Sequence, residues 1–401
     1  MTNHIARREG EVSAAAAEAL PSPQASGPLG LYLHVPFCAV TCDFCAFYQK
    51  RPEKGDFRRY VDGIRRELDL AAPDRPVETV FWGGGTPGLL PPEFIRELGA
   101  LIRERCGRPL EWSVELTPES ARDARLEALC EIGVNRISLG VQSFQPRLLE
   151  ALGRRSSREA VLDAFARLRR HGFANINLDL IFAFPGQTEE EWESDLREAA
   201  GLAPEHLSTY CLTFEEDTAL WVKLAQGEFA RDEEREALFF GMAEEILPRY
   251  GLEKYETSNY ARPGRECRHN LNTWHMAEWL GLGPAAASQF RGRRGANPAG
   301  LEEWLTDLDA GRRGACDSVP LSGALLAADQ LIFGLRLTQG VNPARVEARF
   351  PGTFTPGLRA FFARLCEEGL AREGAEGVIC LTARGRLVVD RIGAEILERM
   401  E

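Results

Sequence analysis

Three cysteines, Cys38, Cys42 and Cys45, lie within the eight-residue sequence CAVTCDFC. Iron–sulfur clusters are commonly held by four cysteine thiolates, and structural zinc by four cysteine or histidine side chains. Three thiolates leave one metal position open. A cubane cluster at this site would therefore expose one iron to a small-molecule ligand. The alternatives are a zinc site completed by Cys267 or His269, and three buried thiols with no shared role.

A second group of residues could bind the polar parts of a small molecule. Thr86 follows a run of three glycines, Gly83–Gly85, and backbone without side chains can approach a ligand closely. Acidic, amide and basic side chains follow in later segments. These are Glu115, Gln142, Arg154 and Asp179. On one face they would supply a carboxylate for an amine, a cation for a carboxylate and acceptors for ribose hydroxyl groups.

These residues need a scaffold that brings them together. From about Leu31 onwards, short β-branched or aromatic runs alternate with longer amphipathic stretches, which predicts βα units and a parallel sheet. The predicted strands are residues 31–37, 79–84, 111–116, 136–142, 175–184 and 207–214. The predicted helices between them are residues 57–71, 92–106, 124–133, 158–172 and 188–202. Six such units predict an α/β fold, a partial (β/α)6 barrel of TIM type with its reactive face at the carboxyl ends of the strands.

The chain divides into four predicted segments. Residues 1–29 are rich in Ala, Ser, Pro and Gly and are expected to form a disordered tail, and residues 30–225 hold the barrel. Residues 226–312 form a loop-rich connecting region with an acidic helix and the aromatic segment HNLNTW. Residues 313–401 predict a winged-helix-like α+β domain. This domain is not basic, so we expect it to pack or to dock a partner rather than to bind DNA.

The composition argues against several classes of protein. Sixty acidic against 48 basic residues give a formal net charge of -12, which disfavours attraction to nucleic acid or to anionic lipid. No run approaches the roughly 18 apolar residues that would span a bilayer. Most of the ten cysteines are scattered, so a disulfide scaffold is not expected. We therefore expect a cytoplasmic protein with no membrane span and no nucleic-acid partner.

Motifs along the chain closely resemble the radical S-adenosylmethionine (SAM) superfamily, and within it the oxygen-independent coproporphyrinogen III oxidase group. The resemblance covers nearly everything from residue 30 to the end of the chain. The motifs are LYLHVPFCAVTCDFCAF, FWGGGTPGLL, NRISLGVQSFQPRLLEALGR and NLDLIFAFPGQT. The resemblance implies that Cys38, Cys42 and Cys45 hold a [4Fe-4S] cluster. It also implies that SAM fills the open iron position through its amino and carboxyl groups.

The resemblance further implies a set of SAM-binding residues. Tyr32 and Phe44 resemble the aromatic contacts to SAM, although packing in the core is the alternative role for each. Gly84, Gly85 and Thr86 resemble the backbone segment that holds the methionine part of SAM in the family. The polar SAM-binding residues of the family are resembled by Glu115, Gln142, Arg154 and Asp179.

Two features distinguish branches of this group. The porphyrinogen-decarboxylating oxidase carries a further cysteine two positions after its third cluster ligand, and Phe47 occupies that position here. The segment YETSNYARPGRECRHNLNTW resembles the haem chaperone branch, in which a His-Asn-x-x-Tyr-Trp motif is associated with haem. Three residues depart from the pattern of that branch. They are Thr273 in place of tyrosine, and Ala287 and Ser156 in place of histidines.

These features lead to ranked expectations about function. The first is a radical SAM haem chaperone that binds haem, with His269 as a candidate iron ligand in an aromatic loop, and passes it to an unidentified acceptor protein. A structural hydrogen-bonding role is the alternative for His269. The second is an oxygen-independent oxidase that decarboxylates two propionates of coproporphyrinogen III. The third is a zinc-stabilised interaction protein. A flavodoxin-type or ferredoxin-type reductant is a plausible electron donor.

Overall fold

The computed structural model describes residues 27–154, 156–216, 218–313 and 316–400. The predicted tail, residues 1–29, therefore lies almost entirely outside the described residues. Its last residue, Leu29, already belongs to the first strand.

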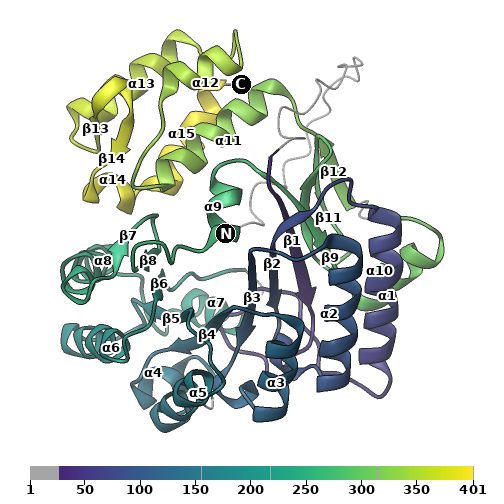
Figure 1. Cartoon of the computed structure of the whole chain (residues 1–401). Helices are drawn as coiled ribbons and strands as arrows, with labels where there is room; N and C mark the ends of the chain where they lie inside the picture. Colours follow the sequence, from purple (N-terminus) through teal and green to yellow (C-terminus); the bar gives the residue numbers. More distant parts are fainter. Residues whose placement is uncertain (1–26, 155, 217, 314–315, 401) are drawn as a thin grey trace.

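Six parallel strands form the centre of the molecule and pair in the order of the sequence (Figure 1). The strands are β1 (Leu29–Val35), β2 (Val77–Gly84), β3 (Glu111–Leu116), β4 (Arg136–Gln142), β5 (Ile176–Phe182) and β6 (His206–Cys211). Within the described residues no pairing joins the two edges of the sheet. The expected partial (β/α)6 arrangement is confirmed.

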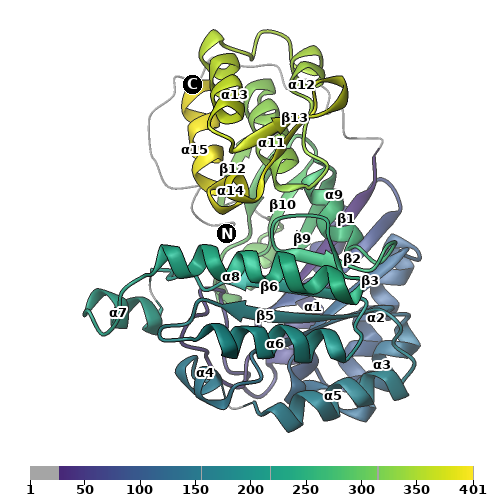
Figure 2. The same cartoon turned by 90° about the vertical axis from the view of Figure 1, so that its left-hand side faces the viewer.

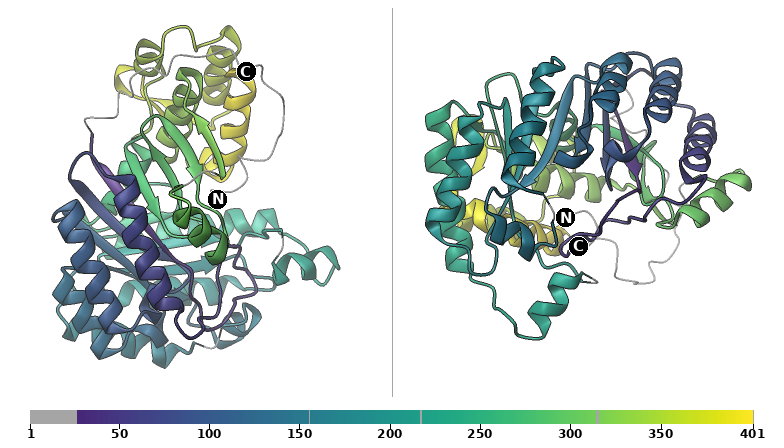
Figure 3. Two further views of the ribbon diagram at one scale, coloured as in Figure 1. Left: turned by 90° about the vertical axis from the view of Figure 1, so that its right-hand side faces the viewer. Right: turned by 90° about the horizontal axis from the view of Figure 1, so that it is seen from below.

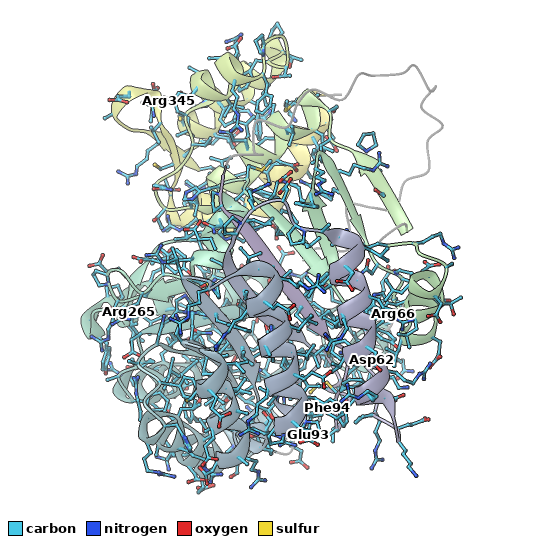
Figure 4. The ribbon with its side chains drawn as sticks, turned by 45° about the vertical axis from the view of Figure 1, so that its right-hand side comes forward. Asp62, Arg66, Glu93, Phe94, Arg265 and Arg345 are labelled. Atoms are coloured by element: carbon cyan, nitrogen blue, oxygen red, sulfur yellow. The ribbon has the colours of Figure 1, made fainter. Side chains whose placement is uncertain are left out.

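Helices cover the outer face of this curved sheet, as the view from below in Figure 3 shows. Apolar residues at alternate positions of the strands, such as Leu31 and Leu33, are fully buried beneath them. In Figure 4, Asp62 and Arg66 mark the outer surface of α1, and Phe94 marks the start of α2. The helices are α1 (Asp56–Ala71), α2 (Pro92–Cys106), α3 (Asp123–Ile132), α4 (Pro146–Ala151), α5 (Arg158–Arg170) and α6 (Glu189–Gly201).

The inner face of the sheet has a different composition. Because side chains alternate along a strand, the positions between the buried apolar residues face the inside of the barrel. These positions carry small, polar and aromatic side chains. On the six strands they include Gly30, Tyr32, His34, Thr79, Phe81, Gly83, Glu111, Ser113, Glu115, Arg136, Ser138, Gly140, Asn177, Asp179, His206 and Ser208. The barrel therefore has a polar interior in which a ligand can be bound.

The structure corrects the prediction of a loop-rich region after the barrel. This part of the chain extends the central sheet on both sides, to 12 strands in the order β12-β11-β10-β9-β1-β2-β3-β4-β5-β6-β8-β7. The added strands have only two to five residues, too few to show an alternating pattern in the sequence. Its elements are α7 (Ala219–Ala225), α8 (Glu233–Ile246), β7 (Glu253–Lys254), β8 (Asn259–Ala261), α9 (Arg268–Trp274), β9 (Glu278–Leu282), β10 (Ala287–Phe290), β11 (Arg293–Ala296), α10 (Leu301–Asp309) and β12 (Cys316–Pro320).

The C-terminal elements form a second hydrophobic core above the amino ends of the barrel strands (Figure 2). Trp274 of α9 packs edge-on against Phe333 of this unit, with ring centroids 5.4 Å apart. Short 3-10 turns complete the secondary structure at Pro87–Leu89, Pro118–Ser120, Leu247–Tyr250 and Ala375–Gly377. The elements of the unit are α11 (Gly323–Arg336), α12 (Pro343–Arg349), α13 (Pro356–Glu367), β13 (Ala371–Glu373), β14 (Ile379–Leu381), α14 (Ala383–Leu387) and α15 (Val389–Met400).

Candidate functional site

The three closely spaced cysteines lie in the loop between β1 and α1, at the carboxyl end of the first strand. Backbone hydrogen bonds close the base of this loop, with Cys38 N donating to Lys50 O at 3.0 Å and Lys50 N donating to Pro36 O at 2.7 Å. A turn between the second and third cysteines places Cys45 N 3.2 Å from Cys42 O. All three thiols are free and partly exposed. The loop thus places all three cysteines at the mouth of the barrel.

Asp43, which the sequence analysis did not single out, anchors this loop from the other side. Its backbone N donates to Leu152 O at 3.1 Å, and its backbone O accepts from Leu220 N at 2.9 Å. Its carboxylate pairs with Lys223 of α7 at 2.8 Å. An aspartate between two clustered cysteines is the sequence signal that could have identified it, since Asp is favoured in turns.

Burial favours the neutral form of two of the three thiols, those of Cys38 and Cys45. Burial raises the pKa of Cys45 to about 11. Burial also raises the pKa of Cys38, despite a contact of 3.5 Å between its Sγ and the Thr86 hydroxyl. A bound metal reverses this tendency and holds thiols as thiolates. Within the described residues, no three His, Cys, Asp or Glu side chains converge closely enough to hold a metal ion, and this includes the three cysteines of the loop.

The glycine segment at the end of β2 packs directly against the cysteine loop. Gly85 N donates to Val35 O at 2.8 Å, and Thr86 N donates to Phe37 O at 2.7 Å. A Cβ atom on Gly85 would lie 2.7 Å from Phe37 O, so this close approach requires glycine. Gly84 N donates to a carboxylate oxygen of Glu115 at 3.2 Å. Because these backbone donors are occupied, the segment can offer a ligand its carbonyl oxygens and the Thr86 hydroxyl.

Two acidic side chains lie on the inner face beside this segment. Burial, with the charge of Asp179 as the second cause, raises the pKa of Glu115 to about 8. Burial also raises the pKa of Asp179. The Asp179 carboxylate accepts hydrogen bonds from Ser138 Oγ and Asn177 Nδ2, both at 2.8 Å. A cation that binds between two such carboxyl groups would favour their ionised forms.

Gln142 and Arg154 meet above Gly140. A Cβ atom on Gly140 would lie 3.0 Å from Gln142 Nε2 and 3.7 Å from one terminal nitrogen of Arg154. Gln142 is buried and has a φ of 69°, an uncommon conformation for a residue other than glycine. Arg154 Nε is buried without a hydrogen-bond partner among the described residues. Strain and an unpaired donor together mark this corner as a place for a ligand.

The two predicted aromatic residues lie in different surroundings. Tyr32 stacks on Phe81 on the inner face, with ring centroids 6.3 Å apart. Its hydroxyl lies 3.3 Å from His34 Nδ1, and His34 Nε2 bonds Tyr48 O just beyond the cysteine loop. Phe44, by contrast, packs against a small apolar cluster outside the barrel mouth. The structure therefore brings Tyr32 to the interior face and Phe44 to the outer side of the cysteine loop.

His269 lies at the opposite end of the strands and on helix α9, which corrects the expectation that it lies in a loop. Its Nδ1 is 2.9 Å from the Thr79 hydroxyl at the amino end of β2. Its backbone N donates to Glu111 at 3.1 Å, and Glu111 also accepts from Arg268 N at 3.0 Å. At about 3.3 Å per residue, the strand from Thr79 to Gly84 separates His269 from the cysteine loop by roughly 17 Å. Burial lowers its pKa to about 4, so its ring is neutral.

The neighbouring Cys267 shares this location. It is fully buried, and its Sγ lies 3.6 Å from a carboxylate oxygen of Glu111. Neither Cys267 nor His269 can therefore complete a metal site in the cysteine loop. This geometry removes the zinc alternative in the form that the sequence suggested.

A chain of hydrogen bonds connects the two ends of the barrel. Asn177 Nδ2 donates to Asp179, which leaves Asn177 Oδ1 to accept from His206 Nδ1 at 2.6 Å. His206 Nε2 then accepts from the Tyr255 hydroxyl at 2.8 Å, and that hydroxyl accepts from Cys267 N at 3.3 Å. This assignment follows from the network, and burial keeps His206 neutral by lowering its pKa. Every hydrogen bond in the chain points from α9 towards Asp179.

Comparison with known proteins places the chain in a family. A family model described as the radical SAM superfamily matches residues 32–199. A Synechocystis protein named heme chaperone HemW is 35% identical over 334 residues, which cover 80% of each chain. A Bacillus subtilis protein of the same name is 30% identical over 369 residues, which cover 90% of this chain and 97% of the relative. The chain belongs to the HemW family.

A solved structure supports the assignment to the radical SAM superfamily. The coproporphyrinogen III oxidase HemN of Escherichia coli, described as a radical SAM enzyme, matches with a TM-score of 0.80 and 25% identity. The match covers 93% of this chain and 90% of HemN. The expected resemblance to the coproporphyrinogen oxidase group is confirmed, and membership of the radical SAM superfamily implies a [4Fe-4S] cluster and SAM as cofactors. No helix in the described part of this HemW-family chain is long and apolar enough to cross a membrane.

Proposed function

We propose that this chain is a radical SAM haem chaperone that binds haem and transfers it to an acceptor protein. The observation that carries the proposal is its identity, over most of both chains, to relatives named heme chaperone HemW. Phe47 supports it, because the oxidase branch has a cysteine at that position. The nine free cysteines among the described residues suit the reducing cytoplasm, which is the proposed compartment.

The carboxyl end of the barrel would hold the cluster and SAM. The three cysteines fit a cluster because they are free and lie in one loop at this end of the barrel, and a bound metal would hold their thiols as thiolates. When bound, the cluster supplies one electron to SAM, and a flavodoxin-type or ferredoxin-type protein is the proposed source of that electron. Cys38, Cys42 and Cys45 would hold the cluster, and Tyr32, Phe44, Gly84, Gly85, Thr86, Glu115, Gln142, Arg154 and Asp179 would hold SAM.

The chemistry of these residues suits a zwitterionic cofactor. Glu115 and Asp179 offer acidic oxygens to a cationic or hydroxylated group, and the backbone N of Gly84 orients the Glu115 carboxylate. Arg154 offers an unpaired guanidinium Nε–H to a carboxylate. Because Glu115 has a pKa of about 8, binding of a cation beside it would release a proton at neutral pH.

The amino end would hold haem, with His269 as its iron ligand. Thr79 engages His269 Nδ1, and no other described side chain hydrogen-bonds the ring, so Nε2 is left for a metal. A partner on one ring nitrogen commonly orients histidine ligands in this way. The low pKa of about 4 keeps the ring in the neutral form that binds iron.

Haem titration of the cluster-loaded protein under anaerobic conditions tests this proposal. Wild type should develop a sharp Soret band, and His269→Ala should weaken haem binding or shift the band. His275→Ala is the matched control, because His275 is a more exposed neighbour that contacts Gln339 rather than the barrel. Absence of a Soret band in wild type would refute the chaperone function. An unchanged band in His269→Ala would refute only the ligand assignment.

The similarity to HemN gives the second candidate, oxidative decarboxylation of coproporphyrinogen III. This activity would use the same cluster and SAM residues. Incubation with coproporphyrinogen III, SAM and a strong reductant tests it directly. Formation of protoporphyrinogen would establish the oxidase and displace the first proposal.

A further inference from the structure

Two buried polar side chains lie next to each other on the inner face of the sheet. Ser113 of β3 and Arg136 of β4 are register partners in the parallel pairing of these strands. Ser113 is 0% exposed and Arg136 is 2% exposed. Both side chains face the interior. Each lies two residues before another inward-facing residue of its strand, Glu115 on β3 and Ser138 on β4.

Neither side chain has the partner that its burial demands. Ser113 Oγ and Arg136 Nε are buried without a hydrogen-bond partner among the described residues. Such groups are normally paired, since an unsatisfied buried donor costs about 1–3 kcal/mol and more if it is charged. Arg136 has Glu111 and Asp179 as nearby opposite charges, but its Nε makes no hydrogen bond among the described residues, so its arrangement in the interior is incomplete.

The carboxylates near Arg136 are already in use. Glu111 accepts hydrogen bonds from the backbone nitrogens of Arg268 and His269. Asp179 accepts from Ser138 and Asn177. Arg136 and Ser113 thus remain as two donors, a guanidinium and a hydroxyl, that lie side by side.

We propose that Ser113 and Arg136 form a carboxylate-binding subsite that holds a propionate group of the porphyrin. The proposal rests on the haem function proposed above and adds a recognition site to it. Guanidinium binds carboxylate with strong, charge-assisted hydrogen bonds, and a neighbouring hydroxyl can donate a further one. A porphyrin carries both an apolar ring and acidic propionates, so it needs both kinds of contact.

The surroundings of the subsite suit the rest of that ligand. Phe81 is the register partner of Ser113 on β2, and its ring lies 5.4 Å from the ring of His269. Tyr32 stacks on the same phenylalanine. The aromatic surface and the carboxylate subsite on the inner face of β1–β4 therefore adjoin the neutral imidazole of His269 on α9.

Haem and its dimethyl ester provide the test, because the ester retains the ring and the iron but lacks the propionate charges. Wild type should bind haem at least about tenfold more tightly than the ester, as a charge-assisted hydrogen bond is worth roughly 1.5–3 kcal/mol. Arg136→Gln should weaken haem binding by about 10- to 100-fold and leave ester binding within about threefold. Ser113→Ala should weaken haem binding by about three- to tenfold. The haem affinity of Arg136→Lys should lie between the affinities of wild type and Arg136→Gln, because lysine keeps the charge but lacks the planar pair of donors.

The other outcomes separate the proposals from each other. Wild type that binds haem and ester equally would overturn the subsite but not the chaperone function. Failure of wild type to bind either compound would overturn both. SAM also carries a carboxylate, so SAM affinity is measured on the same variants. A loss of SAM binding in Arg136→Gln with an unchanged preference for haem would assign the subsite to SAM and overturn the proposal. If Arg136→Gln does not fold, the haem-to-ester ratio of Ser113→Ala decides.

Discussion

The two ends of the barrel differ in how their polar groups are joined to one another. At the amino end, His206 and Tyr255 use their side-chain polar atoms in a continuous hydrogen-bonded chain, and Glu111 bonds the start of α9. At the carboxyl end, Arg154 has an unpaired Nε, and Gln142 adopts a φ of 69°. The hydrogen-bonded chain makes the amino end a support for α9, and the free thiols together with the strained Gln142 mark the carboxyl end as a place for ligands.

The amino end also keeps unpaired polar atoms, among them Ser113 Oγ, Arg136 Nε and the side-chain nitrogens of Asn272 and Trp274 on α9. Its continuous hydrogen-bonded chain, and not complete pairing, distinguishes it from the mouth. The comparison therefore predicts that substitutions at the mouth remove cofactor binding, whereas substitutions at the amino end first affect stability and haem.

The largest expected effect comes from removing a thiol at the mouth. Cys42→Ala should abolish cluster binding and SAM cleavage, because two thiolates cannot hold the cubane in place of three. Iron and sulfide analysis together with the visible absorption of the anaerobic protein measures this. Cys130→Ala, at an exposed cysteine on α3, is the control and should keep its cluster. Retained SAM cleavage in Cys42→Ala would show that the ligand assignment is wrong.

Removal of Glu111 at the amino end should give the next largest effect. Glu111→Ala leaves two backbone donors of α9 unsatisfied and removes a negative charge near buried Arg136. We expect a loss of about 3–5 kcal/mol in the free energy of unfolding. Chemical denaturation measures it, with exposed Glu93→Ala on α2 as the control. A change below about 1 kcal/mol would contradict the view of this end as a support.

A smaller effect should appear in the pH dependence of stability. Burial and the charge of Asp179 raise the pKa of Glu115 from its ordinary value of 4.5 to about 8, whereas the Gly84 N–H and Arg136 act in the opposite direction. The folded state therefore binds an extra proton between these values. In the cofactor-free protein, the contribution of Glu115 to the free energy of unfolding should be greatest below pH 4.5. This contribution should fall as the pH rises to about 8. The slope is at most about 1.4 kcal/mol per pH unit.

Denaturation curves collected across this pH range test the assignment. Glu115→Gln should flatten the dependence, because the amide resembles the protonated acid and does not titrate. Exposed Glu119→Gln should leave the dependence unchanged. An identical slope in wild type and Glu115→Gln would mean that another group titrates.

The sequence predicted the strands and loops around the mouth of the barrel better than it predicted the structure at the amino end, and the reasons are physical. Strands β1 to β6 have alternating or continuous apolar patterns, and the cysteines and glycines follow their carboxyl ends directly. The strands β7 to β12 are too short to show a pattern, so they were not predicted and the region was expected to be loop-rich apart from its acidic helix. The segment HNLNTW was recognised as a motif, but its helical conformation depends on Glu111, a residue more than 150 positions earlier in the chain. No local signal in the sequence links these two segments.

The smallest expected effect concerns the ion pair that anchors the cysteine loop. Lys223 and Asp43 are 39% and 29% exposed, and such pairs contribute about 0.2–1 kcal/mol and are screened by salt. Lys223→Ala should therefore change the rate of cluster loss to a chelator by less than about fivefold, and the difference should shrink at high salt. The backbone bonds of Asp43 to Leu152 and Leu220 remain in this variant and keep the loop in place. A tenfold or greater acceleration that persists at high salt would show instead that the loop depends on α7 for its conformation.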